Sequence, residues 1–282
     1  MPELPEVETV ANGVNERIRG ERIEAVSFSA YKEPFRSDPD EMAQELTGKR
    51  IEHVYRVGKH IVFDLNQKSG GAVSVQWIVH LGMTGRLLVC QADVPEPPHT
   101  HGILRLHSGR ELRFVDPRRF GRMGLHRVVA EKHGAKESGA FRGPGHEPLT
   151  ISPEEFAALF KGRKLTIKAA LLNQKLLHGV GNIYADESLF RAGIRPTRIA
   201  GRLSRERLFR LHAALQEILK NAIKMGGSSV SDYVDADGVR GFFQLEHKVY
   251  MRGGEPCLVC GAPIRQIVLA GRGTHYCPHC QK

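Results

Sequence analysis

Residues 60–79, HIVFDLNQKSGGAVSVQWIV, contain two runs in which apolar side chains recur at every second position. The apolar positions are Ile61, Phe63 and Leu65 in the first run and Val73, Val75, Trp77 and Val79 in the second. A period of two places the side chains of each set on one face of a β-strand. Glycines separate the two runs, as is usual at a turn. This stretch therefore predicts two strands, each with one buried face.

The same alternation continues on both sides of this stretch. ILRL at 103–106 and RELRFV at 110–115 extend the strand pattern to about residue 128, with turn residues between the runs. Before the strands, residues 2–19 carry apolar side chains at helical spacing, and Gly20 is a plausible C-terminal stop. We therefore expect residues 1–130 to form a β-sandwich, or less favourably a barrel, with a leading helix.

The second half of the chain changes to a helical pattern. A polar, glycine-rich stretch predicts a linker at 131–150, and helices are expected to begin after Ser152, Thr166 and Ser204 and at Asn182. The helix after Ser204 is the longest and has a continuous apolar face. Residues 151–242 are thus expected to be helical, and the fold class is α+β with more than one domain.

Four of the five cysteines lie near the C-terminus in two C-x2-C pairs separated by sixteen residues: Cys257, Cys260, Cys277 and Cys280. This spacing is typical of four thiolates around one zinc ion, in a closed structural site. Unligated thiols are the weaker alternative. A module this small gains its folding energy from the metal, so we expect residues 243–282 to form a zinc-finger hairpin.

The composition favours a polyanionic partner. The net charge is +10 and the pI is about 9.5, and Arg191–Lys224 alone holds nine Lys or Arg against two acids. Nucleic acid is the first candidate partner and an anionic membrane surface the second, although a charge run by itself is more often a solvated helix face. No apolar run is long enough to span a membrane. The N-terminus does not resemble a signal peptide, so a cytoplasmic protein is expected.

The N-terminal segment PELPEVET contains groups with an unusual potential reactivity. The initiator methionine is normally removed before a small residue, which would leave Pro2 with a free secondary amine. An α-amino group has a pKa of about 8, so more of it is neutral and nucleophilic at pH 7 than of a lysine. Glu3 and Glu6 place carboxylates beside it that could transfer protons. Acidic residues are also common at helix N-termini for electrostatic reasons alone.

Five sequence blocks together resemble the bacterial formamidopyrimidine-DNA glycosylases, which repair 8-oxoguanine, over nearly the whole chain. The blocks are PELPEVET at the start, GK at 58–59, DPRRFG at 116–121, GVGNIYADES at 179–188 and GRGTHYCPHCQ at 271–281. The sister family, endonuclease VIII, handles oxidised pyrimidines and usually opens with PEGPE, so Leu4 favours the purine enzyme. A non-catalytic zinc-ribbon protein that binds DNA is a further alternative. The resemblance implies a bacterial enzyme that is associated with the nucleoid through its DNA substrate.

The resemblance implies a role for each matched residue. Pro2 is similar to the Schiff-base nucleophile and Glu3 to its acid–base partner, while Glu6 lies beside them as a substrate contact. Lys59 resembles the lysine that contacts phosphate and assists β-elimination, and Arg272 resembles the finger arginine that assists δ-elimination. Met83, Arg118 and Phe120 are similar to the trio that fills the duplex when the lesion flips out. His99, Arg163 and Asn182 align with contacts to the DNA backbone, although His101 competes with His99 for its role.

The resemblance also implies how the parts work together. Both domains would hold damaged double-stranded DNA in a cleft, and residues 226–243 would form a lid over the flipped base. One chain supplies every part, so a monomer is expected, with one structural zinc and no other cofactor. The chain departs from the family at Met251, because VYMR stands where VYGR is common.

Overall fold

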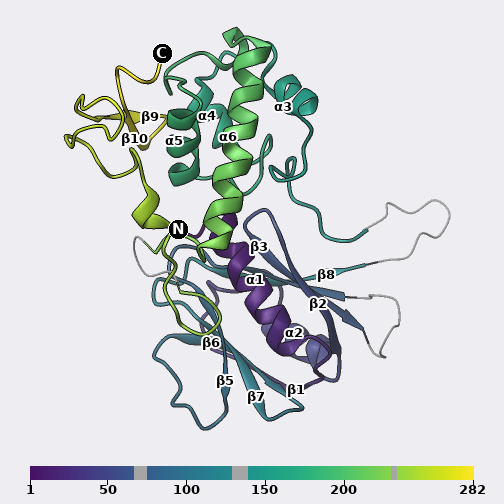
Figure 1. Cartoon of the computed structure of the whole chain (residues 1–282). Coiled ribbons are helices and arrows are strands. Elements are labelled where there is room, and N and C mark those ends of the chain that lie inside the picture. The colour runs from purple at the N-terminus through teal and green to yellow at the C-terminus, as the bar shows by residue number, and fades with distance from the viewer. Residues whose placement is uncertain (67–74, 129–138, 230–233) are drawn as a thin grey trace, which may run out of the picture. The chain divides into compact units, whose positions relative to one another are not determined.

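The computed structural model describes residues 1–66, 75–128, 139–229 and 234–282 (Figure 1). The chain divides into two compact units. The first comprises residues 1–142 and 226–241, and the second comprises residues 143–225 and 242–282. The expected strand residue Val73, residues 131–138 of the expected linker and residues 230–233 of the expected lid lie outside the described residues.

The first unit begins with helix α1 (Leu4–Ile18), which the sequence predicts two residues too long at its start. Glu3 is the N-cap residue, and one continuous stripe of α1 is buried. This stripe consists of Val7, Val10, Ala11, Val14 and Ile18, the apolar positions at helical spacing. It packs against β2, β3 and β5, so the helix lies on strands of both sheets described next.

Two antiparallel sheets form the body of the first unit. In spatial order, one sheet contains β1 (Ile23–Phe28), β6 (Thr100–Leu106), β7 (Arg110–Val115) and β5 (Arg86–Gln91). The other contains β2 (Arg50–Val57), β3 (His60–Asn66), β4 (Val75–His80) and β8 (Arg122–Arg127). Phe63, Trp77 and Phe114 are buried in one shared core, which confirms the predicted sandwich.

Helix α2 (Pro39–Leu46) interrupts the region that the sequence predicts to be strands only. The Asp38 side chain accepts hydrogen bonds from the N–H groups of Asp40 and Glu41, and Pro39 occupies the first turn. These are standard helix-start signals. The prediction was wrong here because the helix is short and buries only Met42 and Leu46, which is too few positions to show a helical period.

The second unit is helical, as predicted. It contains α3 (Pro153–Phe160), α4 (Ile167–Leu171), α5 (Asn182–Arg191), η1 (Ala200–Arg202), α6 (Arg205–Lys224) and η2 (Phe243–Glu246). Ser152 caps α3 in a capping box with Glu155, and Ser204 caps α6. Helix α6 packs on both α3 and α5. Within the described ranges, no helix is long and apolar enough to cross a bilayer.

Helix α4 ends earlier than the apolar pattern predicts. The side chain of Asn173 accepts a hydrogen bond from the N–H of Lys175, and the side-chain amide of Gln174 bonds to Leu172, Gly179 and Val180. Asn side chains compete with the helix for backbone groups in this way. The segment after α4 is therefore a series of turns leading to the start of α5.

The C-terminal hairpin consists of β9 (Arg265–Leu269) and β10 (Arg272–Tyr276). The two turn residues, Ala270 and Gly271, both have positive φ, as a tight two-residue hairpin turn requires. Arg272 begins β10 directly after this turn. The predicted fold class, a β-sandwich with a leading helix followed by a helical region and a hairpin, is confirmed.

Met251 has a strained backbone conformation. Its φ of 59° lies in the left-handed region, and its side chain is 61% exposed. We expect Met251→Gly to stabilise the protein by about 0.5 kcal/mol, because relief of about 1 kcal/mol of strain exceeds the entropy that glycine adds to the unfolded chain. Met251→Ala keeps the strain and should show no gain. Calorimetric melting of the three proteins checks this, and a glycine variant that melts below the alanine variant contradicts it.

Candidate functional site

The start of α1 brings together Pro2 and two of the candidate carboxylates. Pro2 is buried and directly precedes Glu3, which is also buried. The Glu6 carboxylate accepts a hydrogen bond from the N–H of Glu3 at 2.8 Å. The nitrogen of Pro2 is bonded to Met1 in this chain, so it becomes an amine only when Met1 is removed.

The second oxygen of Glu6 holds a distant segment of the chain. Its Oε1 accepts a hydrogen bond from the N–H of Ser228 at 2.7 Å. Gly227 has a φ of 79°, and a Cβ there would lie 2.9 Å from the Glu6 side chain. Gly227 and Ser228 are thus packed closely against the start of α1. Ala236, which follows later in the chain, is buried in the sandwich core. Each Glu6 oxygen therefore accepts a hydrogen bond from a backbone N–H group.

Lys59 lies in the tight turn between β2 and β3. Gly58 has a φ of 61°, and the strands on either side pair through Val57 and His60. The charge of Lys59 acts on His80, whose pKa is lowered to about 4 by burial first and then by His60, Lys59 and Arg122. His80 is therefore neutral at pH 7, and its Nδ1 accepts a hydrogen bond from the N–H of Gly82 at 3.0 Å.

The structure brings Met83, Arg118 and Phe120 together on two touching loops. Met83 and Phe120 are both exposed, and the Arg118 guanidinium lies 4.8 Å from the centroid of the Phe120 ring. The loops meet at Gly82, where a Cβ would lie 2.4 Å from the backbone nitrogen of Gly121. Large apolar side chains in exposed positions indicate a binding surface more than a core.

His99 and His101, which the sequence leaves as competitors, have different environments. His99 is exposed and has a φ of 67°. His101 is buried, and its Nε2 donates to the backbone oxygen of Asp116 at 3.0 Å while its Nδ1 contacts the Ser29 hydroxyl at 3.1 Å. Only His99 is free to meet a partner from solvent, so the structure favours His99 as the contact.

In the second unit, Asn182 begins α5, with Gly181 as the N-cap. The Asn182 side chain donates to the backbone oxygen of Gly273 at 2.9 Å, beside Arg272 in the hairpin. Arg163 is half-buried, and its Nε donates to the backbone oxygen of Leu159 at the end of α3. The structure therefore places Asn182 next to the hairpin and Arg163 apart from it.

A buried ion pair supports the hairpin near Arg272. Lys168 and Asp186 are both completely buried, with Nζ 2.7 Å from Oδ1. Lys168 also donates to the backbone oxygen of Gly273 and to the Thr274 hydroxyl, and Asp186 accepts from the N–H of His275 at 2.9 Å. Arg272 itself is exposed. The pair thus fixes the strand that carries Arg272 to α4 and α5.

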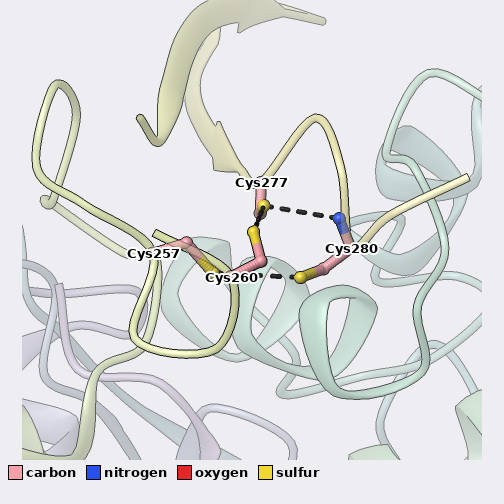
Figure 2. Close-up of side chains that lie close together, drawn as sticks. All are labelled: Cys257, Cys260, Cys277 and Cys280. Atoms are coloured by element: carbon pink, nitrogen blue, oxygen red, sulfur yellow. Dashed lines mark hydrogen bonds between the residues drawn. The ribbon is translucent and has the colours of Figure 1, made fainter. Parts of the chain in front are cut away.

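The four C-terminal cysteines converge on one point (Figure 2). All four sulfur atoms lie within 4.8 Å of one another, with Cys260 and Cys277 at 3.4 Å and Cys257 and Cys280 at 3.9 Å. Four thiolates in a tetrahedron around zinc are about 3.8 Å apart, given Zn–S bonds of about 2.3 Å. Burial raises the pKa of Cys257, but the N–H groups of Val259 and Cys260 outweigh it and lower it to about 7. The cluster can therefore hold one metal ion.

Sequence reasoning missed several residues of these sites. His80 belongs to an alternating strand, and Lys168 lies in an apolar run, so each fits a structural pattern. His60, His80, Phe120 and Arg122 line a cavity of about 500 Å³ in the first unit, and no carboxylate is among the described residues that line it. A charged residue inside an apolar run, such as Lys168 in TIKAAL, is the one signal that could have found any of them.

Models of known protein families match three successive parts of the chain. The model of the formamidopyrimidine-DNA glycosylase N-terminal domain matches residues 1–123, and that of the H2TH domain of the same enzyme matches residues 144–234. A model of the zinc finger found in FPG and IleRS matches residues 254–282.

Relatives match over the full length. A Solibacter usitatus protein named formamidopyrimidine-DNA glycosylase is 46% identical over 100% of both chains. A solved structure of a Lactococcus lactis FPG variant with Fapy-dG-containing DNA is 33% identical, with a TM-score of 0.86 over 100% of both chains. The complex of Lactococcus lactis Fpg with abasic-site DNA is also 33% identical, with a TM-score of 0.85 over 99% of both chains. The chain belongs to the formamidopyrimidine-DNA glycosylase family and is a DNA glycosylase.

Proposed function

We propose that this glycosylase removes oxidised purines, 8-oxoguanine and formamidopyrimidines, from double-stranded DNA and then nicks the strand at the same site. The observation that carries this proposal is the buried position of Pro2 at the start of α1, beside the carboxylates of Glu3 and Glu6. The Lactococcus lactis relative with bound Fapy-dG DNA supports the substrate class.

The chemistry starts at the Pro2 amine after Met1 is removed. Its lone pair forms a bond to C1′ of the nucleoside, the glycosidic bond breaks, and the base leaves with a proton. The nitrogen then loses its proton, its lone pair forms a cationic iminium as the C1′–O4′ bond breaks, and O4′ takes up a proton. Loss of a C2′ proton expels the 3′ phosphate, and loss of a C4′ proton expels the 5′ phosphate. Glu3, which directly follows Pro2, is the carboxyl group that we assign to the exchange of these protons.

Cationic and polar groups of both units bind the DNA backbone. Lys59 in the β2–β3 turn and Arg272 at the start of β10 contact phosphates near the lesion and assist β- and δ-elimination, respectively. Asn182 at the start of α5 and the exposed His99 add further contacts, and Arg163 adds a weaker one. The net charge of +10 supports a polyanionic partner. The cavity beside Phe120, which Arg36 and Arg122 line, fits this as well.

Met83, Arg118 and Phe120 fill the duplex after the lesion flips out. Met83 takes the place of the lost base, Arg118 donates to the unpaired cytosine, and Phe120 separates the neighbouring bases. The support for this assignment is that all three lie on adjoining loops and are exposed. Residues 226–243 form the lid, anchored at its start by Glu6.

Zinc is the metal of the cysteine cluster, one ion per chain, and its role is structural. The sulfur distances suit a tetrahedral site, and four protein ligands leave no position for substrate. A single chain contains every part of the site, so the enzyme acts as a monomer. Its DNA substrate implies that it works at the bacterial nucleoid, in the cytoplasm.

Pro2→Gly should abolish covalent capture of DNA. We expect borohydride to trap the processed wild-type chain on an 8-oxoguanine·cytosine duplex, because reduction converts the iminium to a stable amine. The glycine variant loses the secondary amine and should give no adduct above background, with unchanged DNA affinity. Intact mass of the wild-type protein, lighter by one methionine residue, is the control for processing. A wild-type chain that binds DNA but cannot be trapped would leave only a DNA-binding role.

The substrate preference is tested by comparing two lesions in the same duplex. We expect single-turnover excision of 8-oxoguanine to be about a hundredfold faster than that of thymine glycol, if the site is built for purines. An equal or faster reaction with thymine glycol would contradict the purine assignment and favour an endonuclease VIII-like specificity.

Removal of the metal should unfold the hairpin and weaken DNA cleavage. We expect elemental analysis to find one zinc per chain, and Cys260→Ser to lose it, because serine is a poor zinc ligand at neutral pH. Cys90→Ser is the matched control, since Cys90 lies in β5, outside the cluster. Full zinc content in the Cys260 variant would show that this cysteine is not a ligand.

A further inference from the structure

Asp116 is the buried centre of the loops that carry the proposed DNA contacts. It is completely buried at the end of β7, so it cannot touch DNA itself. We infer that Asp116 is a positioning residue that, together with Thr84, locks Met83, His99 and the Arg118–Phe120 loop into one rigid surface. This inference rests on the proposed function, because it assigns a purpose to loops that the proposal brings to DNA.

The Asp116 side chain binds two loops at once. Its Oδ1 accepts hydrogen bonds from the Thr84 hydroxyl and from the N–H of Arg118, the latter at 3.3 Å. Its Oδ2 accepts from the N–H of Gly121 at 2.7 Å. Thr84 directly follows Met83, and Arg118 and Gly121 enclose the loop with Phe120. One carboxylate therefore joins the two segments that would enter the duplex.

The Asp116 backbone binds a third segment. Its N–H donates to the backbone oxygen of His99 at 3.0 Å, and its own oxygen accepts from Nε2 of His101 at 3.0 Å. His99 has positive φ, a conformation that a non-glycine residue adopts only when its surroundings hold it. The bonds from Asp116 to the His99 carbonyl and to the His101 side chain supply that restraint.

Close backbone packing restricts the two loops that carry Met83 and Phe120. A Cβ at Gly82 would lie 2.4 Å from the nitrogen of Gly121, and one at Gly121 would lie 2.5 Å from the Phe114 ring. Arg119 has a φ of 55°, and its guanidinium lies 4.5 Å from the centroid of the Tyr31 ring. Both loops are thus held by backbone contacts while Met83 and Phe120 remain exposed.

Rigidity of this surface matters because wedging costs free energy. Separating stacked bases costs a few kcal/mol for each step, and a loop that yields would relax before the bases part. Hydrogen bonds from N–H groups to a buried carboxylate are among the stronger ones in proteins. Asp116 therefore helps Met83 and Phe120 to displace a base without being displaced themselves.

The test separates this role from general folding by using two DNA substrates. The variants are Thr84→Val, which loses the hydroxyl at nearly constant volume, Thr84→Ser, which keeps it, and Asp116→Asn. Thr47→Val is the matched control, because its hydroxyl bonds only to the end of α2. Each is measured for excision from an 8-oxoguanine·cytosine duplex and for strand scission at an abasic site in single-stranded DNA, where there is no stack to open.

We expect Thr84→Val and Asp116→Asn to slow duplex excision about tenfold or more, while scission of the single strand stays within about twofold of wild type. Thr84→Ser and Thr47→Val should retain the duplex rate. Wild-type duplex rates in Thr84→Val, or equal losses on both substrates, would overturn the positioning role. If Asp116→Asn fails to fold, the threonine pair carries the test alone. If the wild-type chain cleaves neither substrate, the proposed function is wrong, and this inference falls with it.

Discussion

Buried carboxylates hold the loops that present the proposed DNA contacts. A side chain that reaches DNA must be exposed, so its loop gains little free energy from apolar burial. Glu6, Asp116, Asp186 and Glu187 replace that missing stabilisation by accepting backbone N–H groups inside the protein. Glu6 binds the N–H of Ser228, Asp116 binds those of Arg118 and Gly121, and Asp186 binds that of His275. Glu187 binds the N–H groups of Lys248, Val249 and Tyr250. Loss of one acceptor would leave buried donors unpaired, which is more costly than loss of an exposed bond.

Burying these carboxylates costs desolvation free energy, and different local groups offset that cost at each one. Burial raises the pKa of Glu187, although three backbone N–H groups oppose that shift. Because its folded pKa lies above the unfolded value, the contribution of Glu187 to stability falls as pH rises from the unfolded pKa through the folded pKa. Asp186 instead has the buried ammonium of Lys168 as a partner. Glu6 lies in the first turn of α1, where the helix dipole favours a negative charge. Structural and electrostatic demands are thus met by local partners in each unit.

Local patterns in the sequence predicted much of the fold, but the attachments between distant segments could not be predicted. The strands around Phe63 and Trp77, the capped starts of α3 and α6 and the cysteine pairs each depend on residues close in sequence. The bond from Ser228 to Glu6 spans 222 positions and leaves no periodic signal. His101 is buried beside Asp116 and His99 is exposed. The sequence does not reveal this difference, because the two histidines lie only two positions apart. Candidate contacts could be named from the sequence, whereas the residues that position them needed the structure.

In the proposed function, the position of Pro2 at the start of α1 gives one short segment a part in both the fold and the chemistry. The positive end of the helix dipole and burial both disfavour a charged ammonium there. Glu6 holds the backbone of Glu3 and of Ser228, so its negative charge is shared with two donors. Glu6 therefore joins the start of α1 to Ser228, which is far from it in the sequence.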